Sequence, residues 1–263
     1  MTIHHLDAGT FHPRGSLGGR LAPERLVAHC LLVERPDGLL LVDTGLGRAD
    51  RADPKGRLGP PFVAMMRPDL APEQAAAAQV EALGHSVDDV TDIVVTHLDL
   101  DHAGGIGDFP RARVHVFGAE LDAASKPLRR ESQRYVRAQW QDATWERHDE
   151  AGDGWFGFDS VTVLGDDVVL VPLIGHTRGH CGVAVRRPEG GWLLHAGDSY
   201  FHAGEKETPR TCPSGLRAFQ SLVQMDRRAR HANQERLREL HAAHADEVTV
   251  FCAHDASELD RLR

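Results

Sequence analysis

Four side chains of types that commonly bind metal ions stand within the short segment Thr96–His102. They are His97, Asp99, Asp101 and His102. Imidazole and carboxylate groups bind zinc, and carboxylates also suit harder divalent ions. Leucines alternate with these polar residues, a pattern that a solvated surface loop has no reason to keep. Gly104 and Gly105 follow and allow the backbone to pass close to a bound group. The segment therefore predicts a metal-binding loop.

The combination of a strand followed by a metal-type ligand recurs three more times. His176, Asp198 and His254 each come shortly after an apolar segment that is typical of a strand. A single histidine in such a place is more often a hydrogen-bonded structural residue than a ligand. Four strand ends that each present a ligand are hard to explain by chance, so we expect these side chains to meet at one site.

Short apolar segments bounded by glycine, proline and aspartate predict strands in both halves of the chain. The predicted strands are 2–6, 27–34, 39–42, 92–96, 113–117, 160–164, 168–171, 182–187, 192–196 and 247–252. The predicted helices are 71–83, 119–125, an arginine-rich stretch over 126–137, and 216–245 with a break near His231. Residues 44–70 are expected to form a long loop. This order favours two mixed β-sheets covered by helices in a single domain, residues 1–263.

Composition excludes several classes of function. The chain has 263 residues and a formal net charge of −9, so it is a poor candidate for binding nucleic acid or anionic membranes. The four cysteines are far apart and form no CxxC pair, which favours reduced thiols. The N-terminus has no signal-peptide pattern and no apolar run is long enough for a membrane span, so we expect a cytoplasmic protein.

The motifs resemble those of the metallo-β-lactamase-fold hydrolases, from Val42-Asp-Thr-Gly45 to His254-Asp255. The pattern is most similar to the branch of N-acyl-homoserine lactonases. This resemblance implies an αββα sandwich with a dinuclear metal site at one edge of its two sheets. It also implies that Asp43 braces the ligand loop without binding metal.

The resemblance also assigns the ligands. Site one would take the first two ligand positions of the loop 97–102 together with His176. Site two would take the last two ligand positions of that loop together with His254. These sets are His97, Asp99 and His176, and Asp101, His102 and His254, with Asp198 bridging the two ions. The family motif has histidine where this chain has Asp99. A carboxylate at this position makes the site less positive and, as a hard ligand, would also suit manganese or iron. Zinc is still the expected metal.

The implied reaction is attack of a metal-bridging hydroxide on the carbonyl carbon of a small ester or lactone. Asp101 could pass on the proton, and Tyr200 could contact the substrate carbonyl. His180 and His195 are interpreted as structural residues. Asp255 would either orient a ligand or cap a turn.

The loop 44–70 and the insert 126–158 are predicted to form the pocket walls, because apolar loops over a metal edge suit an acyl chain. The alternative is that their aromatic residues, three tryptophans among them, only pin long loops to the core. The arginines of 126–137 could attract a substrate carboxylate or could form a solvated helix face paired with Glu131. The exposed apolar loops also allow a homodimer.

Two other functions remain open on the sequence. One is a mononuclear iron oxygenase of the same fold, since the loss of one site-one histidine makes a single-metal site conceivable. The other is a catalytically weak binding protein, against which the full set of remaining ligands argues.

Overall fold

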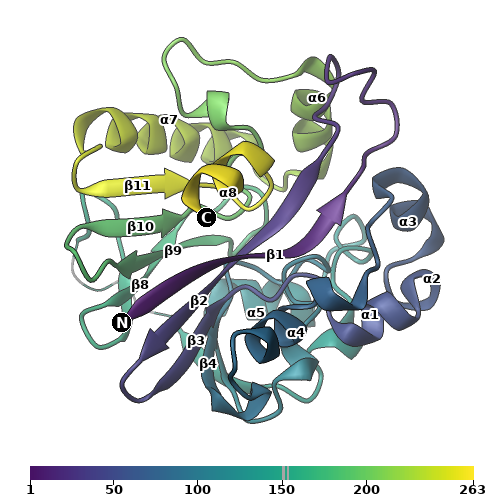
Figure 1. Cartoon of the computed structure of the whole chain (residues 1–263). Helices are drawn as coiled ribbons and strands as arrows, with labels where there is room; N and C mark the ends of the chain where they lie inside the picture. The colour runs from purple at the N-terminus through teal and green to yellow at the C-terminus, as the bar shows by residue number, and fades with distance from the viewer. Residues whose placement is uncertain (150–151, 153) are drawn as a thin grey trace.

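The computed structural model describes residues 1–149, 152 and 154–263, which form two β-sheets with helices on their outer faces (Figure 1). The first sheet has the strand order β1-β2-β3-β4-β5-β6 and the second the order β11-β10-β9-β8-β7. The strands of the first sheet are β1 (Thr2–Phe11), β2 (Leu26–Arg35), β3 (Gly38–Val42), β4 (Val90–Val94), β5 (Arg113–Phe117) and β6 (Thr144–His148). Those of the second are β7 (Val161–Leu164), β8 (Val168–Pro172), β9 (Cys181–Arg186), β10 (Trp192–His195) and β11 (Val248–Phe251).

Both sheets are mixed. In the first sheet β1, β2 and β3 pair antiparallel, whereas β3, β4, β5 and β6 run parallel. In the second sheet β7 to β10 pair antiparallel, and β11 lies parallel to β10. Parallel neighbours need crossover connections. Helices supply them except between β4 and β5, where the connecting loop contains only a short 3-10 turn.

The helices lie between and after the strands in the chain. They are α1 (Arg48–Ala52), α2 (Pro54–Arg57), α3 (Pro60–Met66), α4 (Ala76–Ala82), α5 (Gly118–Ser125), α6 (Ser214–Val223), α7 (Arg227–Ala243) and α8 (Ala256–Leu262). Short 3-10 turns occur at Pro72–Gln74, Val87–Asp89, Ile106–Asp108, Arg137–Gln139 and Ala203–Glu205. In the described part of the chain, no helix has the length and apolar character needed to cross a membrane.

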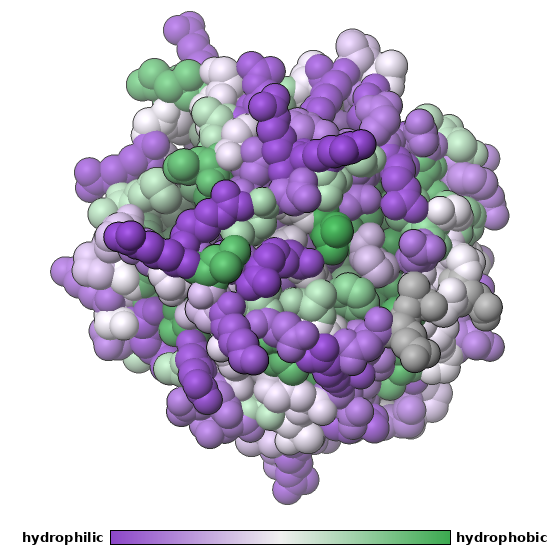
Figure 2. Space-filling model, turned by 180° about the vertical axis from the view of Figure 1, so that it is seen from behind, coloured by the Kyte–Doolittle hydropathy of each residue, from purple (hydrophilic) through white to green (hydrophobic). Residues whose placement is uncertain are grey.

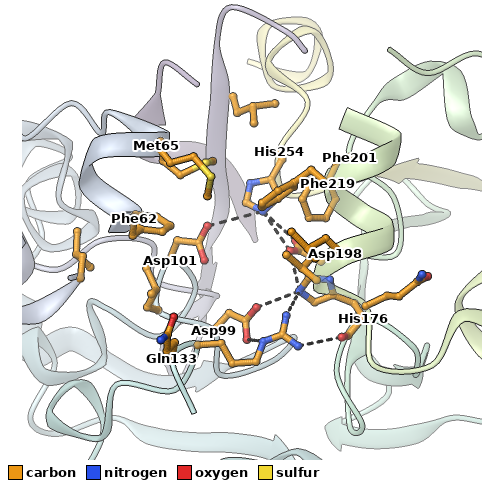
Figure 3. Close-up of a pocket in the computed structure, with 18 of the residues that line it drawn as sticks. Phe62, Met65, Asp99, Asp101, Gln133, His176, Asp198, Phe201, Phe219 and His254 are labelled. Carbon is orange, nitrogen blue, oxygen red and sulfur yellow. Dashed lines mark hydrogen bonds and ion pairs between the residues drawn. The ribbon is translucent and has the colours of Figure 1, made fainter. Parts of the chain in front are cut away.

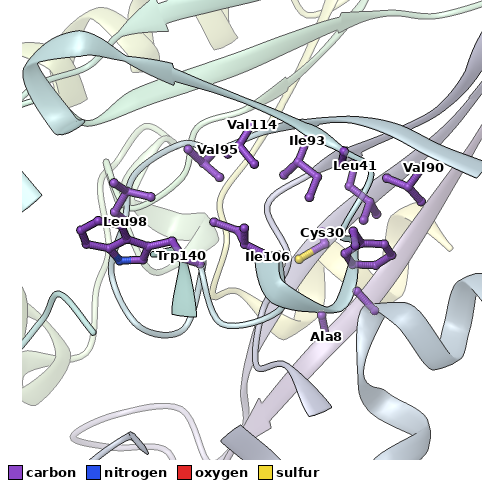
Figure 4. Close-up of a cluster of buried hydrophobic side chains, with 14 of the residues drawn as sticks. Ala8, Cys30, Leu41, Val90, Ile93, Val95, Leu98, Ile106, Val114 and Trp140 are labelled. Carbon is purple, nitrogen blue, oxygen red and sulfur yellow. The ribbon is translucent and has the colours of Figure 1, made fainter. Parts of the chain in front are cut away.

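Three of the four buried apolar clusters form layers between these elements. One lies between the sheets and joins residues such as Leu40 of β3 to Leu170 of β8. A second packs the outer face of the first sheet against α4 and α5, with Ile93 at its centre (Figure 4). A third packs the second sheet against Leu237 and Leu240 of α7. The order helix, sheet, sheet, helix confirms the predicted αββα sandwich.

Figure 2 shows the molecule from behind the view of Figure 1. Hydrophilic side chains dominate this face, and apolar side chains are scattered among them. This distribution agrees with the high fraction of charged residues in the sequence. Burial of the apolar side chains in the three layers is the dominant stabilising term of such a fold.

The predicted strands are present, although β1 runs five residues beyond its predicted end and β6 was not predicted. One loop prediction and two helical predictions also need correction. Residues 44–70 are not an open loop, because Pro54 and Pro60 occupy first-turn positions of α2 and α3. The stretch 126–137 contains turns where a helix was predicted, since Glu131 and Arg134 are drawn into tertiary ion pairs. The break in the last long helix falls between α6 and α7, before His231.

The two sheets bring distant loops to one edge. The loop after β4 contains Thr96, and Asp43 directly follows β3, the parallel neighbour of β4. From the second sheet, the segments after β8, β10 and β11 reach the same edge with His176, Asp198 and His254. Residues separated by about half the chain thereby share one site, as the strand-end pattern predicts.

Candidate metal centre

Seven buried or half-buried side chains form two adjoining groups of metal-type ligands. Within each group, one ligand atom of every residue lies within 4.8 Å of the others. The groups are His97, Asp99, His176 and Asp198, and Asp101, His102 and His254. They coincide with the two sites that the family resemblance implies.

The spacing in the first group suits a tetrahedral ion. Zinc binds nitrogen and oxygen at about 2.0–2.2 Å, so ligand atoms around a tetrahedral ion lie about 3.3–3.6 Å apart. The Nε2 atom of His176 lies 3.0 Å from Asp99 Oδ2 and 3.2 Å from Asp198 Oδ2. The corresponding distances from His97 Nε2 are 3.5 and 3.8 Å.

Asp198 joins the two groups through its two oxygens. Its Oδ1 lies 3.3 Å from His102 Nε2 and 3.1 Å from His254 Nε2. Its Oδ2 lies 3.2 Å from His176 Nε2 of the first group and 3.2 Å from His254 Nε2 (Figure 3). Asp101 completes the second group, with Oδ2 at 3.9 Å from His254 Nε2. The carboxylate of Asp198 therefore contacts both groups.

The histidines present the tautomer that a metal requires. His97 Nδ1 donates to Thr96 Oγ1 at 2.9 Å, and His254 Nδ1 donates to the carbonyl of Val27 at 2.8 Å. These bonds turn the Nε2 atoms toward the centre of the site. In the described part of the chain, the buried Nε2 atoms of His97 and His102 have no hydrogen-bond partner. Such buried polar atoms call for a partner, and an ion would supply it.

Asp43 braces this arrangement from behind. Its Oδ2 accepts from His102 Nδ1 at 2.8 Å and from Thr96 Oγ1 at 2.7 Å, and its Oδ1 accepts from the Thr96 amide. Burial alone would raise the pKa of Asp43, but the charge and hydrogen bond of His102 lower it to about 2. The carboxylate thus stays ionised and fixes the His102 ring.

Glu120 is a supporting residue that the sequence analysis missed. This fully buried carboxylate accepts from the Leu98 amide at 2.9 Å, from Thr177 Oγ1 at 2.6 Å and from the Gly179 amide at 3.2 Å. It therefore ties the loop after β4 to the loop after β8. No local pattern marks it, because α5 carries it and its partners are distant in sequence.

The remaining histidines near the site are structural. The His180 ring donates through Nδ1 to the Leu173 carbonyl and accepts the Asp198 amide at Nε2, so it positions a ligand without binding metal. His195 Nε2 lies 2.5 Å from the His29 carbonyl. Asp255 caps α8, which settles its two possible roles in favour of the cap.

Arg134 contacts the first group directly. Its Nε lies 2.8 Å from Asp99 Oδ1, and its Nη1 donates to the His176 carbonyl at 3.0 Å. Burial would raise the pKa of Asp99, but Arg134 and the nearby histidines hold it well below its usual value. Burial lowers the pKa of His176 to about 4, so this ring is neutral and able to bind metal. Glu131, expected to pair on a solvated face, is buried against Arg178 instead.

The ligands open onto a cavity of about 410 Å³. On one side α3 contributes Phe62 and Met65. On the other side lie Phe219 of α6 and Phe201 of the loop after β10 (Figure 3). Two predicted wall segments line it in part, 44–70 through Leu58 to Met66 and 126–158 through Arg130 to Arg134. Residues 150, 151 and 153 of that insert lie outside the described residues. The contribution of α6 to the cavity wall was not predicted from the sequence.

The aromatic residues of the insert do not line this cavity. Trp140 packs in the core beside α5, and Trp155 packs against the second sheet. Trp145 lies against the same core as Trp140. The interpretation that these tryptophans pin the insert to the core therefore describes them better than a role in the pocket.

Tyr200 also requires a correction, because it is buried away from the cavity. Its hydroxyl donates to the carboxylate of Glu258 at 3.2 Å, and its ring belongs to the core under α7. Burial raises its pKa well above the usual value. Although it follows Asp198 closely in sequence, the chain turns its ring to the far side, so it cannot reach a substrate at the ligands.

We expect Tyr200→Phe to leave hydrolysis unchanged within about threefold while lowering the free energy of unfolding by about 1 kcal/mol, the usual value of one hydrogen bond. The measurements are the rate constant on any substrate found and urea unfolding. A loss of rate beyond tenfold with an unchanged KM would show that the tyrosine does take part.

Over residues 23–254 the chain matches the sequence profile of the Metallo-beta-lactamase superfamily, and it belongs to that superfamily. A probable metallo-hydrolase of Mycobacterium tuberculosis is 43% identical over 258 residues, which cover 96% of this chain and 80% of the relative. The N-acyl homoserine lactonase AttM of Agrobacterium fabrum is 29% identical over 200 residues, 74% of each chain.

Solved structures of lactonases share the fold. An N-acyl homoserine lactone hydrolase with N-hexanoyl-L-homoserine at its catalytic metal centre superposes with a TM-score of 0.75 over 99% of this chain and 96% of that chain. Its sequence is 21% identical, so the likeness concerns the fold alone. The family and its lactonase-like relatives confirm the resemblance read from the sequence motifs.

Proposed function

We propose that this protein is a dinuclear metal-dependent hydrolase that opens a small lactone or cleaves a small ester. One observation carries the proposal: two groups of ligands share the carboxylate of Asp198 at the floor of an apolar cavity. Two divalent ions, zinc first and manganese or iron next, would supply a bridging hydroxide as nucleophile and polarise the substrate carbonyl.

The protein's own groups divide the remaining work. The seven ligands position the ions, and His180 and Asp43 hold two of those ligands in place. Asp101 lines the cavity and keeps one carboxylate oxygen near His254, which places it to accept the nucleophile's proton and return it to the leaving oxygen.

The cavity favours a substrate with an acyl chain. Phe62, Met65 and Phe219 give it apolar walls, and its volume lies in the range of small-molecule sites. Lactonases among the relatives act on N-acyl homoserine lactones, so these lactones are the first class that we would test. The gap between α3 and α6 then limits the length of the acyl chain that the cavity accepts.

The test has two parts. Elemental analysis of the purified protein should give close to two metal equivalents per chain, and hydrolysis of a lactone series from butanoyl to dodecanoyl should be measured by pH-stat. A chelator should abolish the rate, and added zinc or manganese should restore it. One tightly bound iron per chain together with oxygen consumption would contradict the proposal and favour an oxygenase, and a chain that binds no metal would be a binding protein.

We expect Phe219→Ala to raise the KM for long-chain lactones roughly tenfold, because it removes about 1.5 kcal/mol or more of apolar contact. Short-chain lactones should be affected less, since their chains do not reach α6. Phe156→Ala is the matched control, because Phe156 is half-buried beside His244, away from the cavity. Equal effects on short and long chains would contradict the proposed course of the acyl chain.

A further inference from the structure

Arg134 differs from the other arginines around it. The side chains of Arg129, Arg130 and Arg137 are exposed, and Arg130 bonds only the carbonyl of Met225. The side chain of Arg134 is only 14% exposed. It lies at the floor of the cavity, where a positive charge beside a site for divalent cations is unexpected.

The contacts of Arg134 go to two ligands of the same site. Besides the ion pair with Asp99 Oδ1, its Nη2 lies 3.1 Å from His176 Nε2. The other oxygen of Asp99, Oδ2, faces His176 and His97 at 3.0 and 3.5 Å. Asp99 is therefore oriented so that one oxygen meets the arginine and the other meets the ligand group.

We infer that Asp99 and Arg134 act together as one electrically neutral ligand of site one. The inference rests on the proposed dinuclear site. Three carboxylates and a hydroxide would neutralise two divalent ions completely, whereas a neutral residue at position 99 would leave one positive charge. The guanidinium of Arg134 restores that charge. It also pairs a carboxylate that is buried beside it.

The pair makes Arg134 dependent on the negative charge of Asp99. Asp99→His introduces the residue that the family motif has at this position, yet it leaves Arg134 buried beside a divalent ion without a counter-charge. Such uncompensated buried charges are strongly unfavourable. We therefore expect this variant to lose the ion of site one, and we expect Asp99→His/Arg134→Met, which is neutral at both positions, to regain it.

The experiment measures zinc equivalents per chain after equilibration in zinc–chelator buffers, with the circular dichroism spectrum and thermal midpoint of each metal-free variant. Wild type should bind two equivalents. Asp99→His should bind one equivalent. The affinity of site one should fall on the order of 10-fold or more, because Arg134 repels the ion there. The double variant should bind two. Arg129→Met is the matched control and should behave as wild type, because Arg129 is exposed and lies outside the cavity lining.

A second comparison does not depend on the folding of Asp99→His. Arg134→Met alone should tighten the weaker site roughly 10-fold, because it removes a positive charge from beside the ion, and Arg134→Lys should leave it within about threefold. Full wild-type affinity in Asp99→His, or weaker binding in Arg134→Met, would overturn the inference. Wild type that binds fewer than two equivalents would instead overturn the proposed dinuclear hydrolase.

Discussion

Asp198→Asn is expected to reduce the metal content from two equivalents per chain to one or none, and to lower hydrolysis by a factor on the order of 10³. Asp198 is the residue whose two oxygens face both groups of ligands, at 3.1 Å from His254 and 3.2 Å from His176. An amide offers one oxygen and one NH₂ group, and the latter would be directed at an ion or at an imidazole lone pair. One of the two sites must then lose its ligand.

The measurements are elemental analysis after dialysis and the rate on the best lactone. Asp260→Asn is a suitable control, because Asp260 is exposed and pairs only with Arg25 at the surface. If Asp198→Asn kept two equivalents and at least a tenth of the rate, Asp198 would not bridge the ions and the assignment of the two sites would have to change.

Glu120→Gln is expected to lower the free energy of unfolding by about 3 kcal/mol and to weaken metal binding on the order of 10- to 100-fold. The carboxylate accepts hydrogen bonds from both ligand loops. Glutamine has a single acceptor oxygen, and its NH₂ group would meet either the Leu98 amide or the donors from the other loop. One loop would lose its partner inside the protein.

Urea unfolding of the metal-free protein gives the change in stability, and zinc titration gives the change in affinity. Glu146→Gln on the exposed face of β6 is the matched substitution and should change neither. A Glu120→Gln variant that loses stability but binds zinc normally would show that the two loops keep their geometry without this bridge.

The gathering of the candidate ligands at one site could be predicted from the sequence because each follows a strand closely. His97, Asp101 and His102 lie in one loop, and His176, Asp198 and His254 each follow an apolar strand. Local patterns fix strands, and the carboxyl ends of strands gather at sheet edges, so short-range information was sufficient. The family resemblance then supplied the order of the ligands and the αββα fold.

The residues that surround the ligands could not be predicted in this way. Arg134 and Glu120 contact residues between 22 and 59 positions away in the sequence, and Phe219 lines the cavity from a distant helix. No local pattern distinguishes Arg134 from its exposed neighbours. Tyr200 was wrongly predicted to contact the substrate because it follows Asp198 closely in the sequence. Its side chain points away from the site, toward Glu258. Side-chain direction at an irregular turn depends on the packing of the whole fold.

The cavity walls and its floor have different structural origins. The floor is fixed by strand ends in both sheets, whereas the apolar walls come from α3 and α6, short helices outside the two sheets. Substitutions in these helices can alter the size of the cavity without disturbing strand pairing. Substrate range can therefore diverge quickly among relatives, or be redesigned in the laboratory, while the metal chemistry stays the same.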